Sequence, residues 1–79
     1  MKISVEISFY PLCKENYSQE IKDFIDLLQE SGVQAEVGRM STIITGETAR
    51  IFDLLSRGFE NAASKGPAVM ILKVSNACP

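Results

Sequence analysis

The chain of 79 residues has the length of one small domain, and its net charge of -2 and pI near 5.0 do not suit a nucleic-acid backbone as partner. Its 46% hydrophobic content suffices for a globular core, but no apolar run approaches the roughly 20 residues of a membrane-spanning helix. The absence of histidine removes the commonest general base near pH 7 and the commonest metal ligand, which argues against an enzyme and against a bound metal.

Residues 2–11 are predicted to form a β-strand, because apolar and polar side chains alternate strictly along them. The alternation sends one set to each face of a sheet. One set is apolar: Ile3, Val5, Ile7 and Phe9. The other carries a carboxylate, hydroxyls and a phenol, at Ser4, Glu6, Ser8 and Tyr10, and this chemical variety makes it the first candidate for a ligand-binding face.

A loop carrying Cys13 leads to an amphipathic helix, for which Asn16 is a typical N-cap residue. The predicted buried stripe recurs at intervals of three and four residues, at Ile21, Phe24, Ile25 and Leu28. Gly32 is expected to end the helix. A second strand over 33–37 and a third over 40–46 follow, joined by a two-residue turn at Gly38-Arg39.

The second helix is predicted to open at Glu47-Thr48 and to stop at Lys65-Gly66-Pro67. Gly58 inside it favours a close packing contact, since glycine there costs about 1 kcal/mol relative to alanine. A last strand spans 68–75. The predicted apolar stripe of the helix comprises Ile51, Phe52, Leu55, Phe59, Ala62 and Ala63.

This order, β-α-β-β-α-β, predicts an α+β ferredoxin-like sandwich, a single domain over residues 1–79 with both helices on one face of a four-stranded antiparallel sheet. The other face is left open. Parity places further side chains on it beside those of the first strand: Gln34, Glu36, Ser41, Ile43, Thr45, Ile71, Lys73 and Ser75.

Exposed apolar residues on that open face predict self-association into a homodimer or homotetramer, by sheet faces or by edges. Glu6 and Lys73 can instead form a simple structural ion pair across strands. Cys13 and Cys78 do not form a disulfide framework, and the amino terminus has no secretory pattern. We therefore expect a cytoplasmic protein with free thiols and no membrane or nucleic-acid partner.

Three segments resemble a known family: residues 6–12, residues 38–46, and the ending Ser75-Asn76-Ala77-Cys78-Pro79. They are similar to the YkoF-like thiamine- and hydroxymethylpyrimidine-binding proteins, and more distantly to the short UPF0045 thiamine-binding domain proteins. The resemblance implies a ferredoxin-like fold, oligomers, and non-catalytic binding of the aminopyrimidine part of thiamine for vitamin salvage or transport. YkoF-like relatives carry two such domains in tandem, so a homodimer of this chain would have to supply the second copy.

An aminopyrimidine offers an exocyclic amine and two ring acceptors, so it suits carboxylates and hydroxyls. An acidic protein also suits the positive thiazolium ring of thiamine. No other cofactor and no metal is expected. The candidate ligand-binding residues are Glu6, Ser8, Tyr10, Glu36, Ser41, Thr42 and Asn76.

Two other functions stay open. A regulatory or structural homo-oligomer would use the open face only to bind itself. A metallochaperone would need a pair of thiolates after the first strand, where Cys13 stands alone. A phosphatase would need an arginine in that loop, and an RNA-binding sheet would need aromatic residues on both central strands; the sequence has neither.

Overall fold

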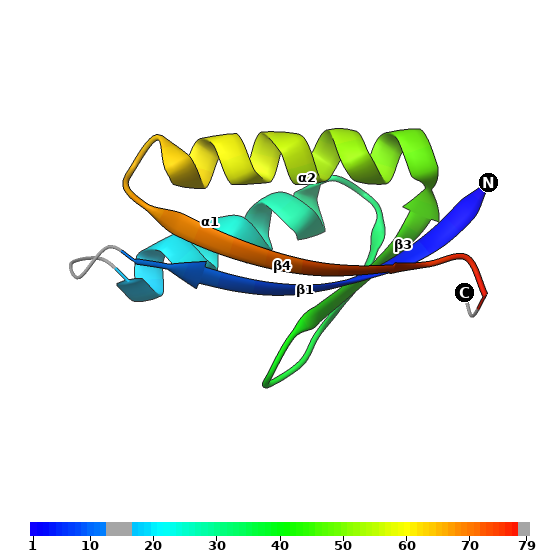
Figure 1. The fold of residues 1–79 in the computed structure, drawn as a ribbon, viewed down its shortest axis with the longest axis horizontal. Coiled ribbons are helices and arrows are strands. Elements are labelled where there is room, and N and C mark those ends of the chain that lie inside the picture. The colour runs from blue at the N-terminus through cyan, green and yellow to red at the C-terminus, as the bar shows by residue number, and fades with distance from the viewer. Residues whose placement is uncertain (13–16, 78–79) are drawn as a thin grey trace.

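The computed structural model describes residues 1–12 and 17–77, and it shows the predicted order of elements (Figure 1). The strands pair antiparallel in the order β2-β3-β1-β4. The chain therefore has the predicted ferredoxin-like architecture. The elements are β1 (Lys2–Pro11), α1 (Tyr17–Glu30), β2 (Gln34–Val37), β3 (Thr42–Glu47), α2 (Thr48–Ala63) and β4 (Ala68–Ser75).

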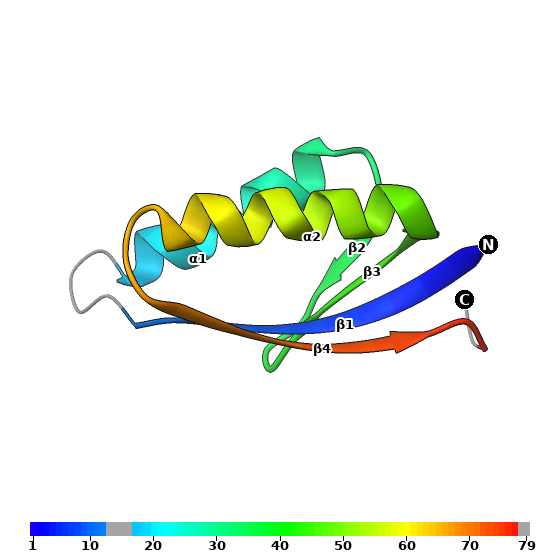
Figure 2. The same cartoon turned by 45° about the horizontal axis from the view of Figure 1, so that its top comes forward.

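Both helices cover the same face of the sheet, and the opposite face carries no helix (Figure 2). The alternation of β1 decides which side chains lie between the layers. Ile3, Val5 and Ile7 are buried under the helices, and their neighbours Ser4 and Glu6 lie on the open face, as predicted. The rest of the core comes from Phe24, Leu28, Ile44, Ile51, Leu54 and Leu55.

Helix α1 buries Phe24 and Leu28 of its predicted stripe and leaves Ile21 and Ile25 half-buried. The ring of Phe24 stacks on Phe9 of β1, with 4.6 Å between the ring centroids. Gly32 follows the helix with a φ of 82°, the left-handed conformation that glycine adopts without strain. The predicted cap Asn16 and the loop residue Cys13 lie outside the described residues.

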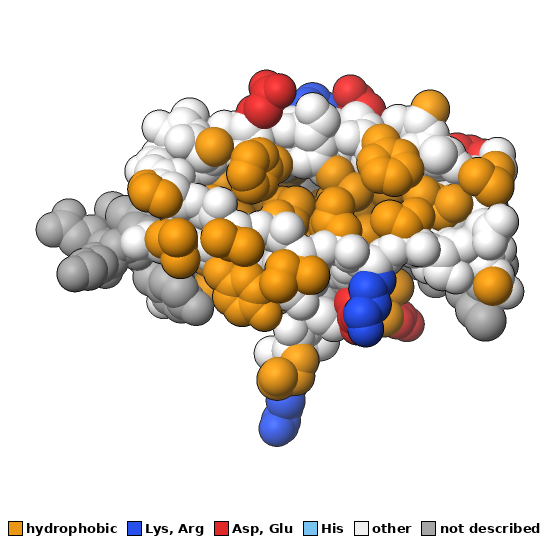
Figure 3. Space-filling model, viewed as in Figure 1, with side chains coloured by type: hydrophobic (Ala, Val, Ile, Leu, Met, Phe, Trp, Pro, Cys, Tyr) orange, Lys and Arg blue, Asp and Glu red, His pale blue; other side chains and the backbone are white. Residues whose placement is uncertain are grey.

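The predicted stripe of α2 is partly wrong. Its buried residues are Ile51, Leu54, Leu55, Gly58 and Ala62, whereas Phe52, Phe59 and Ala63 are exposed. The reason is the contact at Gly58, where an added Cβ would lie 2.9 Å from Cε1 of Phe24. Because α2 approaches α1 through this glycine, the helix turns both phenylalanines outward. Both phenylalanines are exposed. Figure 3 shows apolar side chains gathered between α2 and β4 on this side of the molecule.

The turn between β2 and β3 also differs from the prediction. The last strand pair is Val37 with Thr42, and the amide of Gly38 donates to the carbonyl of Ser41 at 2.9 Å. The two turn residues are therefore Arg39 and Met40 rather than Gly38 and Arg39. Strand β3 begins at Thr42, two residues later than predicted. The register moves by two residues, so the assignment of side chains to faces is unchanged.

Candidate functional site

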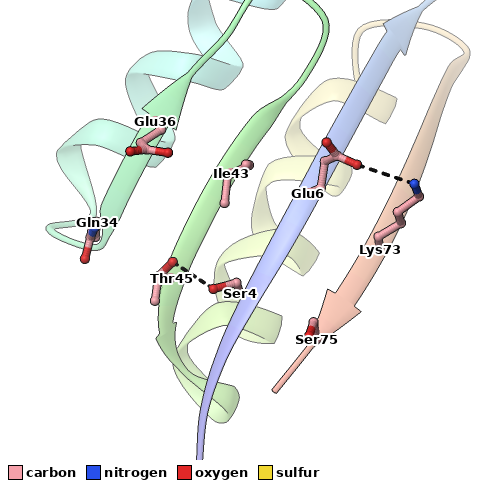
Figure 4. Close-up of a pocket in the computed structure, with 8 residues that line it drawn as sticks. All are labelled: Ser4, Glu6, Gln34, Glu36, Ile43, Thr45, Lys73 and Ser75. Carbon is pink, nitrogen blue, oxygen red and sulfur yellow. Dashed lines mark hydrogen bonds and ion pairs between the residues drawn. The ribbon is translucent and has the colours of Figure 1, made fainter. Parts of the chain in front are cut away.

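A polar hollow of about 450 Å³ lies on the open face of the sheet (Figure 4). Each of the four strands contributes two side chains to it, so the pairing of the strands alone determines its composition. The lining residues are Ser4 and Glu6 from β1, Gln34 and Glu36 from β2, Ile43 and Thr45 from β3, and Lys73 and Ser75 from β4.

These eight side chains form two rows that run across the strands. In one row Gln34 pairs with Thr45, Thr45 with Ser4, and Ser4 with Ser75. In the other, Glu36 pairs with Ile43, Ile43 with Glu6, and Glu6 with Lys73. The first row has no charged side chain, and three of its four side chains are short. The second carries all the charge of the hollow, with one apolar side chain between its two carboxylates.

Glu6 is held by two neighbours. The hydroxyl of Ser41 donates to its Oε2 at 3.0 Å, and Nζ of Lys73 lies 3.8 Å from its Oε1. The predicted cross-strand ion pair with Lys73 is therefore present. Because the Lys73 side chain is 83% exposed, the pair adds little to stability. Its structural effect is to orient the Glu6 carboxylate at one side of the hollow.

Glu36 is in a different situation. It lies beyond Ile43 on the neighbouring strand, and its side chain is exposed. This side chain makes no hydrogen bond or ion pair within the described part of the chain. Two strand spacings of about 4.8 Å separate the backbones that carry Glu36 and Glu6. A flat ring placed over Ile43 would have a carboxylate on each side.

The neutral row supplies hydroxyls close to the floor of the hollow. The Ser4 and Thr45 hydroxyls lie 3.1 Å apart in a mutual hydrogen bond, in which either can be the donor (Figure 4). A hydroxyl both donates and accepts, so this pair can reorient toward a ligand. The amide of Gln34 and the hydroxyl of Ser75 stand at the two ends of the row.

An apolar band adjoins the hollow along β1 and β4. Tyr10 pairs with Val69, and Ser8 pairs with Ile71. The side chains of Tyr10, Val69 and Ile71 are 46%, 43% and 55% exposed. The open face therefore has a polar half, which is hollowed, and an apolar half next to it.

A second hollow, of about 230 Å³, lies between α1 and the turn of the β2–β3 hairpin. Tyr10, Ser41 and Thr42 line it together with apolar residues of β1 and α1, among them Phe9 and Phe24. Thr42 is buried on the helix-covered side, because it pairs with Ile7. The sequence-based set placed it in the same pocket as Glu6, and the structure separates the two.

The predicted site residues thus fall in several places. Glu6 and Glu36 line the polar hollow, and Ser41 reaches it through its bond to Glu6. Ser8 lies one row further along β1 and Tyr10 two rows further. Asn76 follows β4 and contacts Sδ of Met1 at 3.8 Å, away from the hollow. Parity had already placed Gln34, Thr45, Lys73 and Ser75 on this face, but nothing in the sequence showed that they meet in one hollow.

Within the described residues, no three aspartate, glutamate or cysteine side chains form a group that could hold a metal ion. Cys13 and Cys78 both lie outside the described residues, so the metallochaperone hypothesis, which depends on thiolates, stays a hypothesis. Neither described helix is long and apolar enough to cross a membrane.

The fold and this face define a small ferredoxin-like protein with a polar hollow on its uncovered sheet. Residues 2–79 match the model of the YkoF-related family, and the chain belongs to that family. No curated protein matches it significantly.

Three solved structures show the same fold. A protein from Streptococcus pneumoniae superposes with a TM-score of 0.91 at 22% identity, over 99% of this chain and 89% of the other. A domain of unknown function from Bacillus cereus superposes with a TM-score of 0.84 at 24% sequence identity. The match covers 95% of this chain and 75% of the other. A Thermotoga maritima protein described as a "putative thiamine biosynthesis/salvage protein" superposes with a TM-score of 0.85 at 22% sequence identity. The match covers 95% of this chain and 83% of the other.

Proposed function

We propose that the polar hollow binds thiamine or its hydroxymethylpyrimidine part, without catalysis, for salvage or transport of the vitamin. The observation that carries this proposal is the position of Glu36. Its carboxylate has no partner among the described residues and stands beside the apolar side chain of Ile43, at the edge of a row of hydroxyls. The membership in the YkoF-related family and the thiamine-related description of one structural neighbour support the choice of ligand.

The groups of the hollow match those of an aminopyrimidine. The Glu36 carboxylate accepts a hydrogen bond from the exocyclic amine, and the hydroxyl of Ser4 or Thr45 donates to a ring nitrogen. Ile43 supplies an apolar surface for the ring. Two carboxylates against one lysine leave the hollow with a net negative charge, which favours the thiazolium cation of thiamine over a neutral ring.

Isothermal titration calorimetry with thiamine and with hydroxymethylpyrimidine tests the proposal. We expect Glu36→Gln to weaken binding about tenfold or more, since a hydrogen bond to a charged group contributes roughly 1.5–3 kcal/mol. Glu60→Gln removes another exposed carboxylate, from α2, and is the matched control. The absence of binding by the unaltered protein at millimolar ligand would contradict the proposal.

The hollow beside the hairpin is the competing location for the same ligand. Thr42→Val removes its buried hydroxyl and nearly preserves the side-chain shape. If Thr42→Val weakens binding and Glu36→Gln does not, the ligand occupies the hairpin hollow and the polar hollow is not the site.

The second candidate function is a regulatory or structural homo-oligomer without a vitamin ligand. The exposed apolar band of Tyr10, Val69 and Ile71 favours it, because such a band on an uncovered sheet suits a protein partner. Assembly is also part of the first proposal, in which a second copy covers this band and leaves the hollow accessible. Oligomers that form normally but bind neither compound would favour the second function alone.

A further inference from the structure

The charged side chains of the polar hollow are unevenly distributed. All three lie in one row across the strands, in the order Glu36, Glu6 and Lys73. Ile43 separates the two carboxylates. Lys73 therefore stands at the β4 end of the row, on the far side of Glu6 from Ile43 (Figure 4). A ring placed over Ile43 has a carboxylate on each side and no lysine next to it.

The lysine of the hollow is already directed at a carboxylate. Its Nζ lies 3.8 Å from Oε1 of Glu6, and the side chains of Lys73 and Glu6 are 83% and 42% exposed. Solvent weakens the attraction in such a pair, but the opposite charges still offset each other. Glu36 has no such partner among the described residues. The hollow therefore keeps a negative charge that is concentrated on its β2 side.

The hollow also lacks the features with which proteins usually bind phosphate, which are arginine side chains, helix N-termini and backbone amides directed at the ligand. No arginine lines the hollow. Both helices lie on the opposite face of the sheet (Figure 2). The backbone amides of strands lie in the plane of a sheet and do not point out of its face. The remaining donors are Lys73, the amide of Gln34 and the hydroxyls of Ser4, Thr45 and Ser75.

Thiamine and its phosphate ester differ in the sign of their net charge. Thiamine carries one positive charge on its thiazolium ring, and a phosphate monoester adds about -1.5 to -2 at pH 7. With the pyrimidine over Ile43, an arm that extends across the strands passes Glu36 in one direction and Glu6 in the other. The two carboxylates stand on strands about 10 Å apart, close to the screening length of about 8 Å at physiological ionic strength. Both therefore act on the arm.

We propose that the polar hollow selects thiamine over thiamine monophosphate, and that Glu36, Glu6 and Lys73 set this selectivity by their charges. This inference rests on the proposed function, because it concerns the same hollow and the same vitamin. Glu36 repels the phosphate, and Glu6 keeps Lys73 from pairing with it. The protein takes the vitamin as the free alcohol, and phosphorylation follows its release.

Isothermal titration calorimetry with the two compounds at about pH 7 measures the selectivity as the ratio of their dissociation constants. We expect thiamine monophosphate to bind the unaltered protein about tenfold more weakly than thiamine in low salt. Salt raised from about 0.01 M to about 1 M shortens the screening length from about 30 Å to about 3 Å, so the ratio should fall several-fold. The O-acetyl ester of thiamine adds bulk at the same oxygen without charge, and it should bind about as well as thiamine.

Two variants should shift this ratio in opposite directions. Glu6→Gln leaves the hollow with one carboxylate and a lysine that is free to meet the phosphate, so the ratio should fall about threefold or more. Lys73→Gln leaves both carboxylates without a cation, so the ratio should rise. Glu60→Gln changes the net charge of the protein as Glu6→Gln does, but on α2, and should leave the ratio unchanged.

The outcomes separate this inference from the proposed function. If the unaltered protein binds thiamine but binds the monophosphate equally or more tightly, the selectivity is wrong and the proposed function stands. If it binds neither compound, both are wrong. A ratio that ignores salt, with the O-acetyl ester bound as weakly as the monophosphate, would show that bulk and not charge excludes the phosphate. The salt series uses the unaltered protein, so it decides the matter even if a variant loses both ligands.

Discussion

Asp23 connects α1 to the segment that leads into β4. Its carboxylate accepts hydrogen bonds from Nζ of Lys65 at 3.0 Å and from the Gln19 side chain at 2.7 Å. The bond from Lys65 is the main reason that the pKa of Asp23 lies below its ordinary value of 3.8, and the same bond raises the pKa of Lys65. Lys65 is the only residue of this bridge that is distant in sequence, so it fixes the end of α2 against α1.

Lys65→Met should raise the pKa of Asp23 toward 3.8, because it removes the principal donor. A group with a lowered pKa in the folded state stabilises the fold above its ordinary pKa and loses that effect as the pH falls through the folded value. The unaltered protein should therefore exceed the variant in stability at pH 7 and lose this advantage below about pH 4. Carbon-detected NMR titration of Asp23 measures the shift, and Arg57→Met is the control. An unchanged titration would show that the bridge does not form in solution.

At this scale the sequence predicted which face a side chain occupies but not what it touches. Alternation placed Glu6 and Glu36 on the same face correctly, since a strand has a period of two. The difference between them depends on partners that are distant in sequence. Ser41 donates a hydrogen bond to Glu6, and Lys73 forms an ion pair with it. Among the described residues, the Glu36 side chain has neither kind of partner. Thr42 was placed with the ligand-binding set because of its hydroxyl, although its parity puts it under the helices with Ile7.

At the scale of elements, the rotation of α2 about its axis is the feature that sequence reasoning missed. Both Phe52 and Leu54 fit an amphipathic spacing, and periodicity alone does not choose between them. The choice is made by Gly58, whose missing side chain admits the ring of Phe24 from the other helix. A contact between elements thus determines the buried face of one of them.

Gly58→Ala should destabilise the fold even though alanine favours a helix by about 1 kcal/mol. The new Cβ would lie 2.9 Å from Cε1 of Phe24, a ring that already stacks on Phe9, and such overpacking costs roughly 1–3 kcal/mol. We expect a net loss of about 1 kcal/mol, or roughly 4–8 °C in melting temperature. Asn61→Ala, exposed on the same helix, should be neutral or slightly stabilising. A Gly58→Ala variant that melts higher would show that α1 and α2 pack less closely.

The hairpin between β2 and β3 shows the same limit. Glycine suggested the position of the turn, yet the turn residues are Arg39 and Met40. Because a shift of two residues preserves parity, the error moved the ends of the strand without exchanging its faces.

At the scale of the whole molecule, the order of elements and the covered face followed from the sequence. The handedness of the two crossovers leaves few arrangements for β-α-β-β-α-β. The polar hollow did not follow from it, because it depends on how four strands align side by side. Gln34 and Ser75 are 41 positions apart and become the two ends of one row only through the pairing of β2, β3, β1 and β4.

The two sides of the sheet are under separate constraints. None of the side chains that line the polar hollow belongs to the buried core. Ile3, Val5 and Ile7, on the opposite face of β1, form much of that core. Substitutions in the hollow should therefore have little effect on folding. In evolutionary terms, this face can diverge among relatives while they keep their shared architecture, and a designer can vary its eight lining residues without first stabilising the fold.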